Sequence, residues 1–178
     1  MIGIYPATID VEFIHLTGTI VTWWARTEGI IIKDLRPLRS LPINAKIASQ
    51  EKFPAHTKRA IKHWGKLLRN AYSDSPDELE KLAKIQQTLF ELLEHRNSIV
   101  HSFWPYGQTT TGEIILSSVR PGKGDEEAVI YTSYETTIDE MNEINNKMAH
   151  IYHHVMAFSF NSHKLYRQPQ TKADKDAG

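Results

Sequence analysis

The sequence contains no cysteine among its 178 residues. Disulfide bonds, thiolate metal sites and a cysteine nucleophile are therefore excluded. Neither sign of charge is in excess, because 21 lysine and arginine residues balance 21 aspartate and glutamate residues. The whole protein thus has no net field that would attract nucleic acid or a membrane surface. Any binding of an anion must come from a local patch.

Long apolar runs are also absent. The most hydrophobic stretch, IVTWWARTEGIII, contains Arg26 and Glu28 and is too short to span a bilayer. The N-terminus has no basic segment followed by an apolar core, which is the pattern of a signal peptide. These absences predict a cytoplasmic protein without a membrane partner. The length and composition predict one globular domain with its own core.

Apolar residues at intervals of three and four predict four helices. The predicted ranges are 9–35, 54–72, 75–103 and 137–160. The first helix is expected to end before Pro37, because the residue before a proline disfavours helical geometry. The segment 36–53 is expected to form a loop or short turn. Ser75 with Glu78, and Thr137 with Glu140, have the spacing of a capping box at a helix start.

The residue pattern changes after the third helix. The segments GEIILSSV and EAVIYTSYE are rich in β-branched residues and flank a glycine-containing turn. They predict a β-hairpin at about residues 112–134. The predicted fold is therefore mainly α, a four-helix bundle with this hairpin inserted between helices three and four. Residues 1–163 would form the single domain, and the polar residues 164–178 are predicted to be disordered.

Arg96 occupies an unexpected place in the third helix. At about 100° per residue it falls within an apolar face. That face contains Ile85, Leu89, Leu92, Leu93, Val100 and Phe103. A charge buried alone is very costly, so Arg96 needs a partner or access to solvent. The first helix offers Glu28, which interrupts a stripe of apolar residues at Val21, Trp24, Ile31 and Leu35. The two residues form either a structural ion pair or part of a functional site.

The residues after Arg96 favour a functional site. Asn97 and His101 are four apart and share one flank of the helix, and Glu94 lies further round the same flank. A histidine exchanges protons near neutral pH, and an arginine can hold a phosphate with two hydrogen bonds. Together with the Asn97 amide, these groups suffice for metal-free phosphodiester chemistry on RNA. The alternative is that His101 only caps the last carbonyls of its helix.

The segment EHRNSIVHSFW, with Arg96 and His101, resembles the R-x4-6-H motif of the HEPN superfamily. Trp24 and Glu28 match a tryptophan and a glutamate often seen in the first helix of that family. The resemblance covers roughly residues 18–160, and the chain before Thr17 has no clear family counterpart. It implies a helical bundle that forms a homodimer.

The resemblance also implies an activity. Many HEPN proteins are metal-independent endoribonucleases of toxin, antiphage or RNA-processing systems, and they use no cofactor. Carried over, Arg96 would hold the scissile phosphate, His101 would act as general acid or base, and Asn97 would orient one of them. RNA, a second copy and an antitoxin or regulatory protein would be the partners. The alternative is a non-catalytic HEPN-like dimer that binds a nucleotide or a partner protein.

Two further patterns allow functional and structural interpretations. Lys58, Lys62, Lys66 and Arg69 share one face of the second helix, which is either a track for an RNA backbone or a solvated surface. Trp104 either stacks on a base or packs against the hairpin.

His150 and His154 are four apart in the fourth helix. This spacing can bind zinc, but no carboxylate lies close by in sequence. An ordinary polar helix face is the favoured interpretation, and no metal site is predicted.

Overall fold

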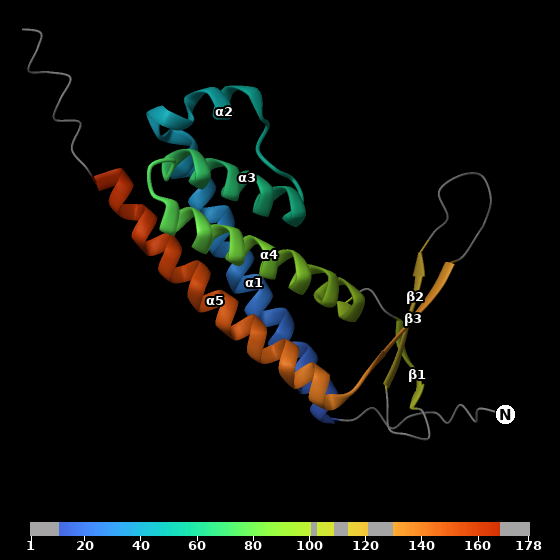
Figure 1. Ribbon diagram of the computed structural model, residues 1–178. Coiled ribbons are helices and arrows are strands. Elements are labelled where there is room, and N and C mark those ends of the chain that lie inside the picture. The colour runs from blue at the N-terminus through green and yellow to red at the C-terminus, as the bar shows by residue number, and fades with distance from the viewer. Residues whose placement is uncertain (1–10, 101–102, 109–113, 121–129, 168–178) are drawn as a thin grey trace, which may run out of the picture. The chain divides into compact units, whose positions relative to one another are not determined.

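The computed structural model describes residues 11–100, 103–108, 114–120 and 130–167. The chain is mainly helical, and Figure 1 shows the elements in sequence order. In that order they are α1 (Val11–Ser40), the short 3-10 helix η1 (Pro42–Asn44), α2 (Ala45–Gln50), α3 (Thr57–Ala71), α4 (Pro76–Val100), β1 (Phe103–Gln108), β2 (Ile114–Arg120), β3 (Ile130–Thr136) and α5 (Ile138–Arg167).

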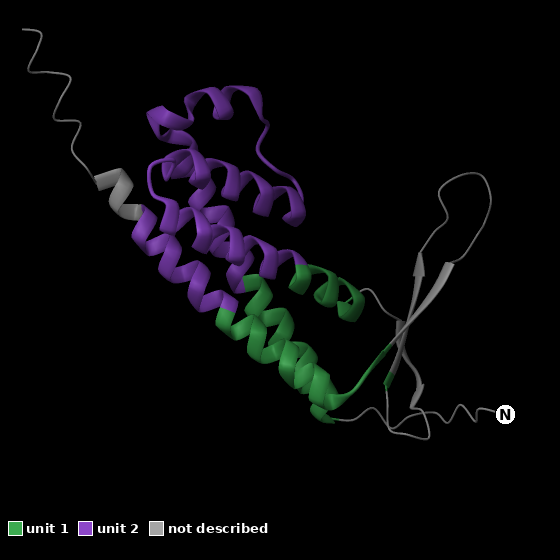
Figure 2. Ribbon diagram, viewed as in Figure 1, with its two compact units in different colours: residues 1–25, 91–150 green, residues 26–90, 151–178 purple. Residues whose placement is uncertain are grey.

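The chain divides into two compact units, coloured separately in Figure 2. Unit 1 comprises Met1–Ala25 and Glu91–His150, and unit 2 comprises Arg26–Phe90 and Ile151–Gly178. Helices α1, α4 and α5 each contribute residues to both units. The single domain expected for residues 1–163 stays a prediction.

Helix α1 is longer than its sequence predicted. It runs through Pro37 to Ser40, so the predicted end before Pro37 is wrong. A proline inside a helix removes one backbone donor and costs stability. Burial offsets this cost, because Leu35 and Leu38 on either side of Pro37 are fully buried.

The segment after α1 is helical rather than a loop, since η1 and α2 occupy most of it. Asn44 explains how this segment is held. Its side chain is fully buried, and its Nδ2 donates to the carbonyl oxygens of Leu38 at 2.8 Å and Leu67 at 3.2 Å. One amide thus satisfies a carbonyl in the last turn of α1 and another in α3.

The core of unit 2 contains a buried carboxylate. Asp34 of α1 is 1 % exposed and accepts hydrogen bonds from Trp64 Nε1 at 3.3 Å and from Ser159 Oγ at 2.7 Å. Trp64 also packs edge-to-face on Phe158, with ring centroids 6.2 Å apart. Three helices of unit 2 therefore meet around a polar group that needs all of these partners.

The strands form one antiparallel sheet in the order β1-β2-β3. Strands β2 and β3 pair in register from Ile114 opposite Thr136 to Arg120 opposite Ile130. The turn predicted at residues 120–126 lies outside the described residues except for Arg120, which ends β2, and the predicted hairpin as a whole stays a prediction.

Strand β1 was not predicted, because residues up to Phe103 were assigned to the third helix, which ends at Val100. Its pairing with β2 is irregular between Phe103 and Gly107. Pro105 lies in this interval and cannot donate a ladder hydrogen bond, which suits an edge strand.

Helix α5 begins as predicted and ends later. The capping box is confirmed, because Glu140 N–H donates to Thr137 Oγ1 and Thr137 N–H donates to the Glu140 carboxylate, both at 3.1 Å. The predicted end at Phe160 is wrong, since α5 continues to Arg167, and Ser162 is fully buried. The predicted tail therefore cannot begin at residue 164, and residues 168–178 lie outside the described part of the chain.

Two hydrogen bonds are seen at the start of α4. The backbone N–H of Glu78 donates to the carbonyl of Ser75 at 3.1 Å, and the Glu78 carboxylate accepts from Lys81 at 2.7 Å. The side-chain capping box expected for Ser75 and Glu78 stays a prediction. None of the helices that the structure describes combines the length and the apolar composition needed to cross a bilayer.

Helices α3 and α4 approach closely at Gly65. The Gln86 side chain is 7 % exposed, donates to the carbonyl of Ile61 at 2.9 Å and accepts from Arg69. A Cβ atom on residue 65 would overlap the Gln86 amide, whereas a Cβ on Gly29 of α1 would meet nothing within 4 Å. Only glycine leaves room at position 65 for this buried amide.

We expect Gly65→Ala to lower the free energy of unfolding by about 1–3 kcal/mol, because Gln86 must leave its place. The matched control is Gly29→Ala, which gains the same helix propensity without a clash and should stabilise by about 0.5–1 kcal/mol. Urea denaturation of both variants measures the difference. Equal effects of the two substitutions would contradict a close approach at Gly65.

Candidate functional site

Arg96 lies on the apolar face of α4 within unit 1. Leu93 one turn before it is 4 % exposed, Ile99 one turn after it is fully buried, and Arg96 itself is half-buried. Val100, which was predicted on the same face, is also half-buried. The helix therefore presents an arginine in its buried stripe while leaving part of that side chain open to solvent.

Arg96 and Asn97 contact each other. Arg96 Nη1 donates to Asn97 Oδ1 at 3.1 Å. Because the amide oxygen accepts this bond, the Asn97 NH2 group is oriented as a donor to any further acceptor. A guanidinium and an amide NH2 held side by side form a set of donors that suits phosphate oxygens.

The other residues predicted for this site are placed less completely. Glu94 is exposed on α4. His101 lies outside the described residues, and α4 ends at Val100 just before it. Trp104 lies in β1, where its backbone alone is described. The structure thus brings Arg96 and Asn97 together, and the roles of His101, Glu94 and Trp104 stay predictions.

Glu28 has a partner within its own unit. Its Oε1 accepts a hydrogen bond from Thr57 Oγ1 at 2.5 Å, at the start of α3. The buried stripe of α1 contains Thr27, which is 1 % exposed, and Ile20, which is fully buried. The sequence predicted the neighbouring residues Glu28 and Val21 at these two places. Glu28 is half-buried beside that stripe. Its pairing with Arg96 stays a prediction.

The basic face predicted on the second helix lies on α3. Lys58, Lys62, Lys66 and Arg69 are all exposed. Inside unit 2, Lys66 is paired with the Glu51 carboxylate and Arg69 donates to Gln86. The face is therefore solvated as expected, but its charges are not equally available to a ligand.

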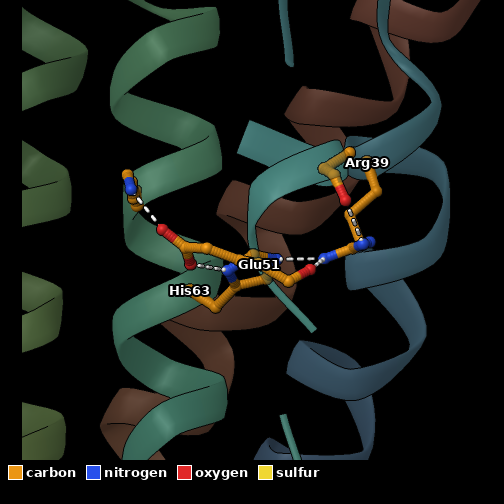
Figure 3. A network of polar contacts seen from close by, with 5 residues as sticks. Arg39, Glu51 and His63 are labelled. Carbon is orange, nitrogen blue, oxygen red and sulfur yellow. Dashed lines mark hydrogen bonds and ion pairs between the residues drawn. The ribbon is translucent and has the colours of Figure 1, made fainter. Parts of the chain in front are cut away.

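Sequence reasoning missed a polar network centred on His63, drawn in Figure 3. The His63 ring is 5 % exposed. Its Nε2 lies 2.9 Å from Arg39 Nη1, and its Nδ1 lies 2.6 Å from Glu51 Oε2. Arg39 also donates to the carbonyl oxygens of Glu51 at 2.9 Å and Ala48 at 2.6 Å. Arg39 and His63 together hold Glu51, the first residue after α2.

These contacts assign the protonation of the His63 ring. A guanidinium has no acceptor, so the bond with Arg39 requires His63 Nε2 to accept. The ring proton is then on Nδ1, where it donates to the Glu51 carboxylate. A signal for this residue exists in the sequence, since His63 lies between Ile61 and Trp64 on the apolar face of its helix. It interrupts that face in the same way as Arg96 interrupts the face of α4.

A groove of about 540 Å³ lies over the exposed side of this network. Residues 51–55 form one wall, and Arg59, Lys62, His63 and Lys66 form the other. Among the described residues that line it, four are cationic and Glu51 alone is anionic. We name this feature the α3 groove.

A second groove, of about 350 Å³, lies between α4 and α5 within unit 2 and is lined in part by Lys81, Lys84 and His154. His150 and His154 are both exposed. Within the described ranges, no three histidine, aspartate or glutamate side chains are placed so that they could hold a metal ion.

No protein-family model matches the chain, and no curated protein or solved structure matches it. The HEPN resemblance therefore stays a prediction from the sequence. The structure itself shows a half-buried Arg96 that donates a hydrogen bond to Asn97.

Glu51 titrates below its ordinary range because of its two partners. The hydrogen bond from Lys66 contributes most and the bond from His63 contributes next, and together they lower the pKa of Glu51 from its ordinary value of 4.5. A lowered folded-state pKa means that the stabilisation is present above pH 4.5. It is lost as the pH falls through the folded-state pKa.

We expect Glu51→Gln to lower the free energy of unfolding at pH 7 by about 0.5–1 kcal/mol, a modest effect because the carboxylate is partly exposed and water screens it. The difference from the wild type should shrink as the pH falls below 4.5. Thermal unfolding between pH 3 and 7 measures it. Glu80→Gln is the control, because its lowered pKa comes from an exposed pair with Lys84 and should matter little. A constant difference across this pH range would contradict the role of Glu51.

Proposed function

We propose that the protein is a HEPN-like, metal-independent endoribonuclease that cleaves RNA through the ribose 2′-OH. One observation carries this proposal: Arg96 is kept half-buried in an apolar helix face and is hydrogen-bonded to Asn97. Packing alone does not require a cation there, since apolar residues at such positions are often no less stable. A function that needs a fixed guanidinium accounts for the arrangement.

The proposed chemistry assigns each group one role. The Arg96 guanidinium binds the non-bridging oxygens of the scissile phosphate, and Asn97 holds that guanidinium in place. A general base takes the proton from the 2′-OH, whose oxygen bonds to phosphorus while the bond to the 5′-oxygen breaks. A general acid gives a proton to that 5′-oxygen. His101 supplies one of these two functions, and the products are a 2′,3′-cyclic phosphate and a 5′-hydroxyl.

A second copy of the chain completes the proposed site. One Arg96–Asn97–His101 set supplies a single histidine, whereas the reaction uses both a base and an acid. A twofold axis near the C-terminal end of α4 would bring two sets together. An antitoxin or other regulatory protein that covers this end of the dimer would restrain the activity, as expected for a toxin or antiphage effector.

We expect the purified protein to cut single-stranded RNA in the presence of EDTA and to leave 2′,3′-cyclic phosphate ends. His101→Ala should lower the cleavage rate by at least about 100-fold, the usual contribution of a positioned acid or base. Arg96→Ala should lower it by a similar factor, because the charge that develops on the phosphate loses a stabilising donor. His154→Ala is the control and should cleave normally. Product ends are identified by mass spectrometry, and circular dichroism checks that each variant is folded.

Three other outcomes of these experiments would each contradict part of the proposed function. Cleavage that survives His101→Ala shows that the assigned role is wrong. Cleavage that needs a divalent ion and is lost in His154→Ala points to metal chemistry elsewhere. A dimer that binds nucleotides but cuts no RNA supports the non-catalytic alternative.

Because the chain has no cysteine, an introduced thiol reports on the dimer directly. We expect Glu94→Cys to form a disulfide between two copies on mild oxidation, since residue 94 lies close to the proposed axis. Glu80→Cys, about 21 Å away along the same helix at 1.5 Å per residue, should form none. Gel electrophoresis without reductant and light scattering at micromolar concentration measure both. A monomer, or a disulfide only at residue 80, would rule out this dimer.

A further inference from the structure

We infer that the α3 groove binds single-stranded RNA, as a substrate-binding site additional to the residues around Arg96. The choice of RNA as the ligand rests on the proposed function, while the groove itself does not. Lys52, Arg59 and Lys62 line it, and within the described residues none of these three side chains has a hydrogen bond or ion pair. Lys66 is the fourth cation and is already paired with Glu51.

Charge favours an anionic occupant. Four cationic side chains and one carboxylate line the groove, which leaves three positive charges in a chain with no net charge. Cations without partners keep their full attraction for phosphates and release counterions when they bind. The concentration of charge is therefore local and is not a property of the whole surface.

The wall formed by residues 51–55 adds an aromatic ring. Phe53 lines the groove and remains 46 % exposed, although burial would stabilise a phenylalanine. An aromatic ring beside unpaired cations is the arrangement that binds single strands, because bases stack on the ring while phosphates meet the charges. A duplex does not offer its base faces in this way. These features select a single-stranded nucleic acid over an acidic protein surface.

The polar network in Figure 3 holds this wall in place. Glu51 is bound through its carboxylate to His63 and Lys66 and through its carbonyl to Arg39. Lys52 and Phe53 follow directly, so the chain that carries them starts from a fixed point. A wall held before the ligand arrives lowers the entropy lost on binding.

The groove revises the track predicted from the sequence. Lys62 and Lys66 belong to both, whereas Lys58 and Arg69 do not line the groove. Arg69 is hydrogen-bonded to Gln86 instead. The groove contains Lys52, Phe53 and Arg59, which the predicted track did not include.

Binding is tested with a fluorescein-labelled, 2′-O-methyl oligouridine of about ten nucleotides, within the usual site size of a single-strand binding surface. This probe has no free 2′-OH, so the wild-type protein cannot cleave it by the proposed route. We expect Lys52→Gln/Arg59→Gln/Lys62→Gln to weaken binding at least tenfold in fluorescence anisotropy. The slope of log affinity against log salt should fall in magnitude by about 2, as expected for three phosphate contacts on a single strand.

The matched control is Lys33→Gln/Arg36→Gln/Lys46→Gln. It removes the same charges, two lysines and one arginine, from exposed positions of unit 2 outside the groove. It should change affinity less than twofold. Phe53→Ala should weaken binding at least fivefold with an unchanged salt slope, because it removes stacking and no charge.

Equal losses in the two triple variants would overturn the inference, since net charge would then explain them. Unchanged affinity in the groove variant would overturn it as well. A groove variant that loses binding to phosphatidylserine vesicles while keeping RNA affinity would assign the groove to a lipid surface instead.

The groove and the catalytic proposal fail in different ways. The groove variant should still cleave a dinucleotide, whose single phosphate can meet only one of the two sites at a time, and should cleave a long RNA more slowly at low substrate concentration. A protein that binds the probe through the groove but cuts no RNA would refute the catalytic proposal alone. A protein that cuts RNA equally well with and without the groove cations would refute the groove alone.

Discussion

The chain of contacts from Arg39 through His63 to Glu51 is the constraint on which much of unit 2 depends. An arginine can only donate, so the imidazole must accept at Nε2, and its remaining proton must then find an acceptor at Nδ1. The Glu51 carboxylate is that acceptor. The hydrogen-bonding capacity of each residue therefore determines whether the next residue in the network must donate or accept. Removing one member would leave the buried ring of His63 with an unsatisfied nitrogen.

This network also explains why a groove exists beside α3. Residues 51–55 have few buried apolar side chains of their own, and Phe53 is largely exposed. Their position comes from polar contacts at Glu51, which lie in sequence between the end of α2 and the start of α3. The groove is thus held by hydrogen bonds to backbone and side-chain atoms. Within the described residues, the side chains of Lys52, Arg59 and Lys62 take no part in these bonds and remain available to a ligand, whereas Lys66 is paired with Glu51.

Local patterns predicted the helices well. The capping box of Thr137 and Glu140 depends on two neighbouring residues and appears as expected. Predictions failed where distant residues decide the outcome. Helix α1 passes Pro37 because Leu38 is buried and because Asn44, six residues later, binds its carbonyl. Strand β1 was missed because Pro105 and Gly107 look like the end of a helix and give no strand signal.

In the candidate site, too, a contact between sequence neighbours could be predicted and contacts between distant residues could not. Helical periodicity alone placed Arg96 on an apolar face, and its neighbour Asn97 accepts its hydrogen bond. The partner of Glu28 could not be read from the sequence, because Thr57 comes from another helix and several residues in the chain offered a donor. His63 did carry a signal, since a polar ring interrupts an apolar stripe. Its two partners lie 12 and 24 residues away, where spacing gives no guidance.

Neither compact unit is a continuous stretch of chain. Unit 1 joins residues 1–25 to residues 91–150, and unit 2 joins residues 26–90 to residues from 151 onward. During synthesis on a ribosome, the early part of each unit must therefore wait for its later part to emerge. A nascent chain stopped before residue 91 contains neither Arg96 nor a complete unit, and one stopped at residue 150 still lacks the α5 residues that surround Asp34 and Trp64. Translation thus has to pass Ser159 before the buried contacts around Asp34 and Trp64 in unit 2 can form.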